Sequence, residues 1–177
     1  VWFSGTGPEN DVIVSTRIRL ARNIAGHTFP NRASLQERKS VFEDVAQACA
    51  AIPRCKGFTV ANFMGLKSLN QQYLVEDRAA SPDMLRLEGD RGVVGDADRE
   101  VSIMINEEDH IRLQAMGSGS CAGDLWSRVD GIDTALGKKL TLAFDRRRGF
   151  LTCCPTNSGT GLRVSFLMHL HGLTLTK

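Results

Sequence analysis

A short stretch near the C-terminal end of the chain combines a thiol, a glycine turn and an arginine. It reads Cys-Pro-Thr-Asn-Ser-Gly-Thr-Gly-Leu-Arg from Cys154 to Arg163. Glycines at such positions allow a positive φ or a close approach of the backbone to another group. Arg163 begins the apolar run 164–170, which predicts a buried strand, and a guanidinium there requires an anionic partner. The alternative is a plain glycine turn between two core strands, with a surface arginine.

A second group of chemically active residues lies at 106–112, in the order Asn-Glu-Glu-Asp-His-Ile-Arg. It follows the alternating run 101–105, which predicts a strand. Three adjacent carboxylates repel one another, so we expect cations nearby. Two simpler explanations stay open. The acids could cap a following helix, or Arg112 could form a helical ion pair with Glu108 or Asp109.

Two further arginines stand in the strand-like segment 11–20. Because side chains alternate along a strand, Arg17 and Arg19 face one side while Ile18 and Leu20 face the other. Guanidinium groups about 7 Å apart on one face repel unless carboxylates or a bound anion lie between them. The alternative is a solvated strand edge that carries arginine against aggregation. Arg22, just beyond, favours the anion.

The composition is that of an ordinary globular domain, with 42% hydrophobic and 24% charged residues among 177. We expect one domain over residues 1–177. A net charge of +2 and dispersed arginines with few aromatic residues do not favour a nucleic-acid or membrane partner. Five cysteines without a Cys-x-x-Cys pair, and no signal-peptide pattern, predict a reducing, cytoplasmic setting without a metal site.

The elements that must position these residues are readable in part. Ser34 and Glu37 form a capping box for a helix that Pro53 ends, with Val41, Phe42, Val45, Cys49 and Ile52 on its buried face. Other predicted elements are a strand at 58–63, a short helix at 67–73, a hairpin or loop at 88–99, a Gly/Ser loop at 116–123, a helix capped by Asp124 with Leu125, Val129, Ile132 and Leu136 inside, and strands at 140–144 and 150–152. The Arg-Arg-Arg run at 146–148 between the last two strands reads as a solvated hairpin tip, with a docking site as the alternative.

Three segments taken together resemble the guanidino kinases, the ATP:guanido phosphotransferases. They are Ser-Thr-Arg-Ile-Arg at 15–19, Asn-Glu-Glu-Asp-His at 106–110 with Arg112, and the segment from Cys154 to Arg163. The closest resemblance is to the bacterial branch that phosphorylates arginine side chains of proteins. It implies an α+β domain with an antiparallel sheet flanked by helices, of the guanidino kinase catalytic type and incomplete at its C-terminal end. The chain begins directly at the catalytic part, without the helical domain of the free-arginine and creatine kinases, which favours a protein substrate.

The resemblance also implies roles for individual residues. Glu108 would align the acceptor guanidinium and accept its proton, Glu107 would help, and Cys154 would lie against the same guanidinium as a thiolate favoured by positive neighbours. ATP would be the phosphoryl donor, and its Mg²⁺ would be held mainly by phosphates and water. The expected phosphate clamp is Arg17, Arg19, Arg112 and Arg163. The ATP-contacting set as a whole is Ser15, Thr16, Arg17, Ile18, Arg19, Arg112, Arg163, Val164, Ser165, Phe166 and Leu167.

Departures from the family pattern leave other functions open. Arg78 stands where the family usually has histidine, and Ser158 where this branch usually has an aliphatic residue. The chain ends at Lys177, before the family's last strand, its phosphate-closing loop and this branch's phosphoarginine-binding domain. The alternatives are a small-molecule guanidino kinase and a non-catalytic nucleotide- or phosphoarginine-binding module. Partners implied by the resemblance are arginine-bearing proteins, a second copy of the chain, and stress-response protease and activator proteins.

Overall fold

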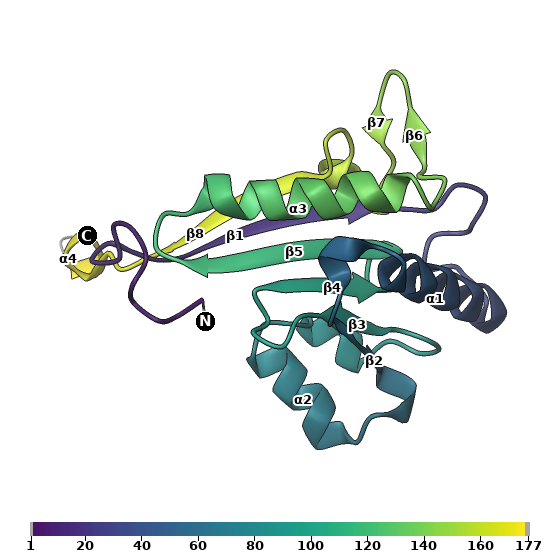
Figure 1. Cartoon of the computed structure of the whole chain (residues 1–177), viewed down its shortest axis with the longest axis horizontal. Coiled ribbons are helices and arrows are strands. Elements are labelled where there is room, and N and C mark those ends of the chain that lie inside the picture. The colour runs from purple at the N-terminus through teal and green to yellow at the C-terminus, as the bar shows by residue number, and fades with distance from the viewer. Residues whose placement is uncertain (1, 176–177) are drawn as a thin grey trace.

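The structure, a computed structural model, describes residues 2–175. Its centre is a six-stranded, fully antiparallel sheet in the order β2-β3-β4-β5-β1-β8 (Figure 1). The strands are β1 (Ile13–Arg22), β2 (Thr59–Asn62), β3 (Gly92–Gly95), β4 (Val101–Ile105), β5 (Ile111–Ser118), β6 (Phe144–Asp145), β7 (Gly149–Phe150) and β8 (Leu162–Met168). The helices are α1 (Leu35–Ala50), α2 (Ser68–Glu76), α3 (Ala122–Gly137) and α4 (His171–Leu175), with 3₁₀ turns at Pro53–Cys55, Phe63–Gly65, Pro82–Leu85 and Pro155–Asn157. This architecture confirms the α+β class.

The main core lies between one face of the sheet and helices α1 and α3. Ile18 and Leu20 of β1 are each 1% exposed there, together with the apolar faces of both helices. The capping box of α1 is present, since Ser34 accepts from the Glu37 backbone N–H and Glu37 accepts from that of Ser34. The predicted inner residues within α1 and α3 are all buried, which confirms both helical faces. Ile52 is buried too, but α1 ends at Ala50, before Ile52 and Pro53.

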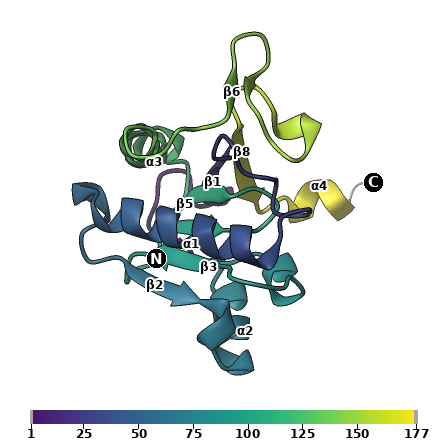
Figure 2. The ribbon, with the colours of Figure 1, turned by 90° about the vertical axis from the view of Figure 1, so that its right-hand side faces the viewer.

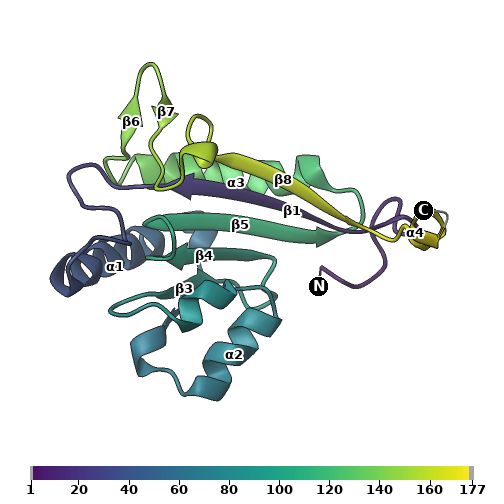
Figure 3. The same cartoon turned by 180° about the vertical axis from the view of Figure 1, so that it is seen from behind.

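The opposite face of the sheet is only partly covered. A smaller apolar cluster, Phe63, Ala79, Ala80, Met84, Val93 and Met104, closes it over β3 and β4 on the side of α2. Seen from behind, β5, β1 and β8 run across the molecule with both large helices on the far side (Figure 3). Arg17 and Arg19 lie on this less covered face because they alternate with Ile18 and Leu20.

The segment after the carboxylate run is a strand, which corrects two of the sequence-based alternatives. Asn106, with φ of 57°, and His110 close a tight turn between β4 and β5 through the hydrogen bond from the Asn106 N–H to the His110 carbonyl oxygen. No helix follows the acids, so they do not cap one, and Arg112 forms no helical ion pair. The loop expected from 116 begins later, because β5 continues to Ser118.

Other differences lie at the C-terminal end and in the connections. The run 164–170 is not a buried strand, because β8 is an edge strand and Arg163 and most of its neighbours are exposed. Asp124 lies in the first turn of α3, whose N-cap is Cys121. The expected strands 140–144 and 150–152 shrink to the two-residue pair β6 and β7, and the 88–99 segment contains the buried strand β3. None of the described helices is both long enough and apolar enough to span a bilayer.

Candidate active site

Four arginines from three strands share the less covered face of the sheet. Arg19 of β1 lies directly opposite Arg163 of β8, and Arg17 is two residues away on the same face. On the other side, Arg112 of β5 pairs in register with Ala21, two residues beyond Arg19. Like charges placed directly opposite destabilise a sheet. We call Arg17, Arg19, Arg112 and Arg163 the arginine cluster; strand pairing brings its members together from distant points of the chain.

The electrostatics of the arginine cluster indicate a site for an anion. The pKa of Arg19 is lowered to about 10 by burial first, and then by the other guanidinium groups of the cluster. The buried Nε of Arg19 has no hydrogen-bond acceptor among the described residues. The pKa of Arg17 is lowered by burial, then by Arg112, Arg78 and Arg163. A polyanion would relieve this repulsion and supply the missing acceptor.

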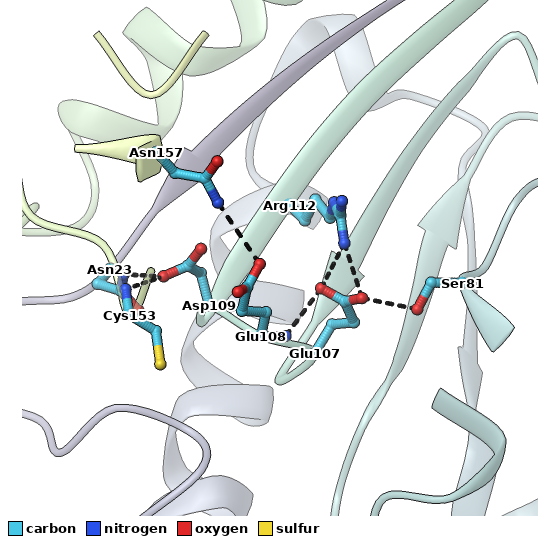
Figure 4. A network of polar contacts seen from close by, with 8 residues as sticks. All are labelled: Asn23, Ser81, Glu107, Glu108, Asp109, Arg112, Cys153 and Asn157. Carbon is cyan, nitrogen blue, oxygen red and sulfur yellow. Dashed lines mark hydrogen bonds and ion pairs between the residues drawn. The ribbon is translucent and has the colours of Figure 1, made fainter. Parts of the chain in front are cut away.

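Glu107 holds one arm of the cluster in place. Its carboxylate is 3% exposed and accepts from Arg112 Nη1 at 2.7 Å on each oxygen, from the Ser81 hydroxyl at 2.7 Å and from the Glu108 N–H at 2.8 Å (Figure 4). Burial alone would raise the pKa of Glu107, but Arg112 and these hydrogen bonds lower it overall. Glu107 is therefore an anion that orients Arg112.

Glu108 points the other way, toward the cysteine loop, residues 151–161. It is exposed, and the Asn157 Nδ2 donates to its Oε2 at 3.4 Å (Figure 4). Partial burial raises the pKa of Glu108, and the carboxylates of Asp109 and Glu107 raise it further. Within the cysteine loop, the Cys154 Sγ lies 2.9 Å from the Thr156 hydroxyl. Glu108 and Cys154 line one cavity of about 220 Å³, the cysteine-loop cavity.

A buried network ties the acidic turn to the cysteine loop. The Asp109 carboxylate, 2% exposed, accepts from the Asn23 Nδ2 at 2.6 Å and from the Cys153 N–H at 2.7 Å (Figure 4). Asn23 in turn accepts from the His110 N–H at 2.9 Å. Asp109 thus fixes the backbone next to Cys154 relative to Glu108.

Three cavities adjoin along the open face. The β1–β5 cavity, about 540 Å³, is lined by Arg17, Arg19, Arg78, Arg112, Glu107, Gln114 and residues of the 75–83 segment. The cysteine-loop cavity shares Arg19 and Arg112 with it. The Trp2 cavity, about 190 Å³, shares Arg17 and Arg78 with the β1–β5 cavity. Part of the arginine cluster is therefore the common wall between the β1–β5 cavity and the cysteine-loop cavity, which holds the acid and the thiol.

Most of the sequence-predicted site residues line these cavities. Arg17, Arg19, Arg112 and Glu107 line the β1–β5 cavity. Glu108, Cys154 and Arg163 line the cysteine-loop cavity. Ser15, Ser165, Phe166 and Leu167 line the Trp2 cavity.

Thr16, Ile18 and Val164 are not among the lining residues. Ile18 is in the core, Val164 pairs with it in register, and the Thr16 hydroxyl is buried against the Gly119 carbonyl oxygen at 2.5 Å. Only the backbone of these three could touch a ligand in the cavities.

Several lining residues had no separate signal in the sequence. Gln114 lines the β1–β5 cavity because β5 pairs with β1, and Ser81 lines it from the 75–83 segment on another side of the cavity. Asn157 was part of the quoted cysteine motif but had no assigned role. Arg78 was noted only as a departure from the family pattern, and here it stands between two of the cavities.

Comparison with known proteins agrees with this geometry. The family model "ATP:guanido phosphotransferase, C-terminal catalytic domain" matches residues 40–177. Proteins named protein-arginine kinase from Moorella thermoacetica and Desulforamulus reducens are each 41% identical over 179 residues, covering 99% of this chain and 51% and 50% of those proteins. The chain thus spans about half the length of the curated relatives it matches.

Solved structures give the same family. The duplicated taurocyamine kinase from Schistosoma mansoni with bound transition state analog components superposes with a TM-score of 0.87 at 26% identity, over 97% of this chain and 25% of that one. Lombricine kinase gives a TM-score of 0.81 at 26% identity, over 98% of this chain and 52% of that one. Because the family model matches residues 40–177, which are most of the chain, the chain belongs to the ATP:guanido phosphotransferase family.

Proposed function

We propose that this chain is catalytic machinery of a protein-arginine kinase, which transfers the γ-phosphoryl group of ATP to a guanidinium nitrogen of an arginine side chain. The observation that carries the proposal is the common wall formed by Arg19 and Arg112. On one side of it lies the β1–β5 cavity, and on the other lie Glu108 and Cys154. Residues 1–177 would form one partial catalytic domain.

ATP would bind with its phosphates in the β1–β5 cavity, against the arginine cluster. Its volume, about 540 Å³, lies in the range of small-molecule sites. The nucleobase would reach the Trp2 cavity, where Trp2 and Met116 offer apolar surface, and Arg78 would lie between base and phosphates. In phosphoryl transfer the protein mainly positions the groups and neutralises charge, and a cluster of four guanidinium groups supplies both.

The acceptor arginine would enter the cysteine-loop cavity between Glu108 and Cys154. A guanidinium nitrogen attacks the γ-phosphorus, the bond from that phosphorus to the β,γ-bridging oxygen breaks, and ADP leaves with its electron pair. The nitrogen's proton passes to the Glu108 carboxylate. A guanidinium has a pKa above about 12, far above that of a carboxyl group even where the pKa of that group is raised, as it is for Glu108. Glu108 would therefore contribute more by orienting the acceptor guanidinium than by acting as a strong base.

Mg²⁺ is expected with ATP, where it would neutralise part of the phosphate charge. Glu107 already accepts hydrogen bonds on both oxygens, so the arrangement fits a cation held by phosphates and water. A homodimer and stress-response protease and activator partners remain predictions from the resemblance. The cytoplasmic setting remains a prediction from the cysteine pattern.

The test is incubation of the chain with labelled ATP and Mg²⁺ in the presence of casein and free arginine. Acid-labile, alkali-stable label on casein supports the proposal, and label on free arginine alone supports a small-molecule kinase. Nucleotide binding without either product indicates a non-catalytic module.

Two variants test the roles. Glu108→Ala is expected to abolish transfer and keep ATP binding, whereas Arg163→Ala weakens ATP binding. Glu43→Ala and Arg86→Ala, at exposed positions that line none of the three cavities, serve as matched controls. An active Glu108→Ala variant would contradict the assigned roles.

A further inference from the structure

A small hairpin stands out from the body of the molecule next to the cysteine loop. It consists of β6, β7 and the tip Arg146-Arg147-Arg148, and Figures 1 and 2 show it projecting at the end of the molecule opposite α2. All three arginines are exposed. The Asp145 Oδ1 accepts from the N–H groups of Arg147 and Arg148 at 2.9 Å, which fixes the turn. We call residues 144–150 the basic hairpin.

The base of the basic hairpin is held firmly. The buried Arg22 donates to Asp133 of α3 at 3.0 and 2.8 Å and to the Thr160 carbonyl oxygen at 2.9 Å. The same guanidinium lies 3.6 Å from the centre of the Phe150 ring. Phe150 and Gly159 exchange two backbone hydrogen bonds, at 2.8 and 3.2 Å. An arm with a fixed base presents its charges at little entropic cost when a partner binds.

The basic hairpin and the cysteine-loop cavity belong to one continuous segment. Cys154 follows the tip residue Arg147 by seven residues, so the two are at most about 25 Å apart even if the chain were fully extended. An extended protein segment whose arginine occupies the cavity could therefore reach the tip with residues within roughly seven positions of that arginine.

The basic hairpin offers an excess of positive charge. The hairpin and the chain leading into it carry Lys138, Lys139 and three arginines against the single Asp145. Among the described residues no ion pair is formed by the three tip guanidinium groups. The cysteine-loop cavity holds one exposed carboxylate, Glu108, besides its arginines. A partner that brings an arginine to Glu108 and anions to the hairpin complements both groups.

We propose that the basic hairpin is a docking arm for acidic residues that lie a few positions from the target arginine in the substrate protein. The proposal rests on the proposed function, because it places the arginine of a protein in the cysteine-loop cavity. Such exposed contacts are weak singly and are screened by salt, so the arm would tune substrate choice.

The experiment compares two fluorescent peptides with one central arginine. One carries three glutamates four to seven residues from the arginine, and the other carries glutamines. Fluorescence anisotropy is measured for the wild-type chain, for the tip variant Arg146→Gln/Arg147→Gln/Arg148→Gln, and for the control Lys56→Gln/Lys67→Gln/Arg86→Gln, which makes the same charge change at exposed positions outside the basic hairpin.

The wild type and the control variant are expected to bind the glutamate peptide about tenfold more tightly at low salt, and the tip variant to show no preference. Arg→Glu at the three tip positions should reverse the preference toward a lysine-flanked peptide. Equal affinities in the wild type, or a preference kept by the tip variant, would overturn the docking arm. So would tip-dependent binding of an RNA oligonucleotide or phosphatidylserine vesicles without binding of the glutamate peptide.

Failure of the proposed function gives a different result. The anisotropy measurement requires no phosphoryl transfer, so a preference for glutamate that depends on the tip supports the arm even if no label reaches either peptide. Conversely, labelling of both peptides with equal KM by the wild type and the tip variant would support the kinase and refute the arm. Melting temperatures of all variants verify that the exposed substitutions leave the fold intact.

Discussion

Replacing Arg19 by glutamine is expected to stabilise the nucleotide-free protein while weakening nucleotide binding. The pKa of Arg19, about 10, is roughly 2.5 below the ordinary value for arginine. At about 1.36 kcal/mol per pKa unit, this would be about 3.4 kcal/mol for a fully buried group. Since the side chain is only half-buried, solvent screening reduces the expected gain to roughly 1 kcal/mol.

The sign follows from the direction of the pKa. The folded state disfavours the protonated guanidinium, so the penalty is present throughout the range below about pH 10 and is relieved only above it. At pH 7 and low salt, Arg19→Gln should therefore raise the melting temperature by about 2–4 °C for a chain of this size. Urea unfolding without nucleotide provides the free energy of unfolding independently.

The effect on binding is larger and opposite. Arg19 has an unpaired buried Nε and faces both the β1–β5 and the cysteine-loop cavities. Each lost hydrogen bond from a charged group costs about 1.5–3 kcal/mol, so ATP affinity should fall at least tenfold by calorimetry. Arg86→Gln, at an exposed position that lines neither cavity, should change neither quantity. If Arg19→Gln destabilised the empty protein, or bound ATP as tightly as the wild type, the anion-site reasoning would be wrong.

Three further substitutions test the site and its support. Because the pKa of Glu108 is raised, its carboxylate becomes protonated as the pH falls through a value above the ordinary glutamate pKa near 4.3. Initial rates of transfer should therefore fall with decreasing pH in that range. Glu108→Gln should lose transfer at all pH values and keep ATP binding, which initial-rate and binding measurements would check. Asp109→Ala leaves the Asn23 amide and the Cys153 N–H without their acceptor and should cost about 2–4 kcal/mol in urea unfolding, whereas a loss below 1 kcal/mol would contradict the network. Ser34→Ala removes the α1 cap and should cost about 1 kcal/mol, with Ser34→Asp restoring most of it.

The local parts of this structure were predictable from the sequence. Alternation along β1 placed Arg17 and Arg19 on one face and Ile18 and Leu20 on the other, and the register agrees. The capping box at Ser34 set the start of α1. These features depend on neighbours within a few residues, so a linear pattern contains them.

The non-local parts were not predictable in this way. The tight turn at Asn106 makes β5 a strand, and only its pairing with β1 brings Arg112 beside Arg19. The apolar run of β8 has the same composition whether it is buried or lies at an edge, and here it lies at an edge. The prediction that all of residues 15–19 contact ATP also overlooked the alternation of side chains along a strand. This alternation turns the side chains of Thr16 and Ile18 toward the helices.

The two faces of the sheet explain how the arginine cluster can exist without its anion. Guanidinium groups that repel would separate on a flexible loop, but β1 and β5 are held by side chains on their other face, where Ile18, Leu20, Leu113 and Ala115 are at most 1% exposed. Burying such side chains contributes roughly 1.5–3 kcal/mol for each large residue, more than the roughly 1 kcal/mol of repulsion at Arg19. The charges are therefore fixed before any anion binds. For the proposed phosphoryl transfer, little reorganisation would remain as charge develops, and this is the condition under which electrostatic stabilisation of a transition state is most effective.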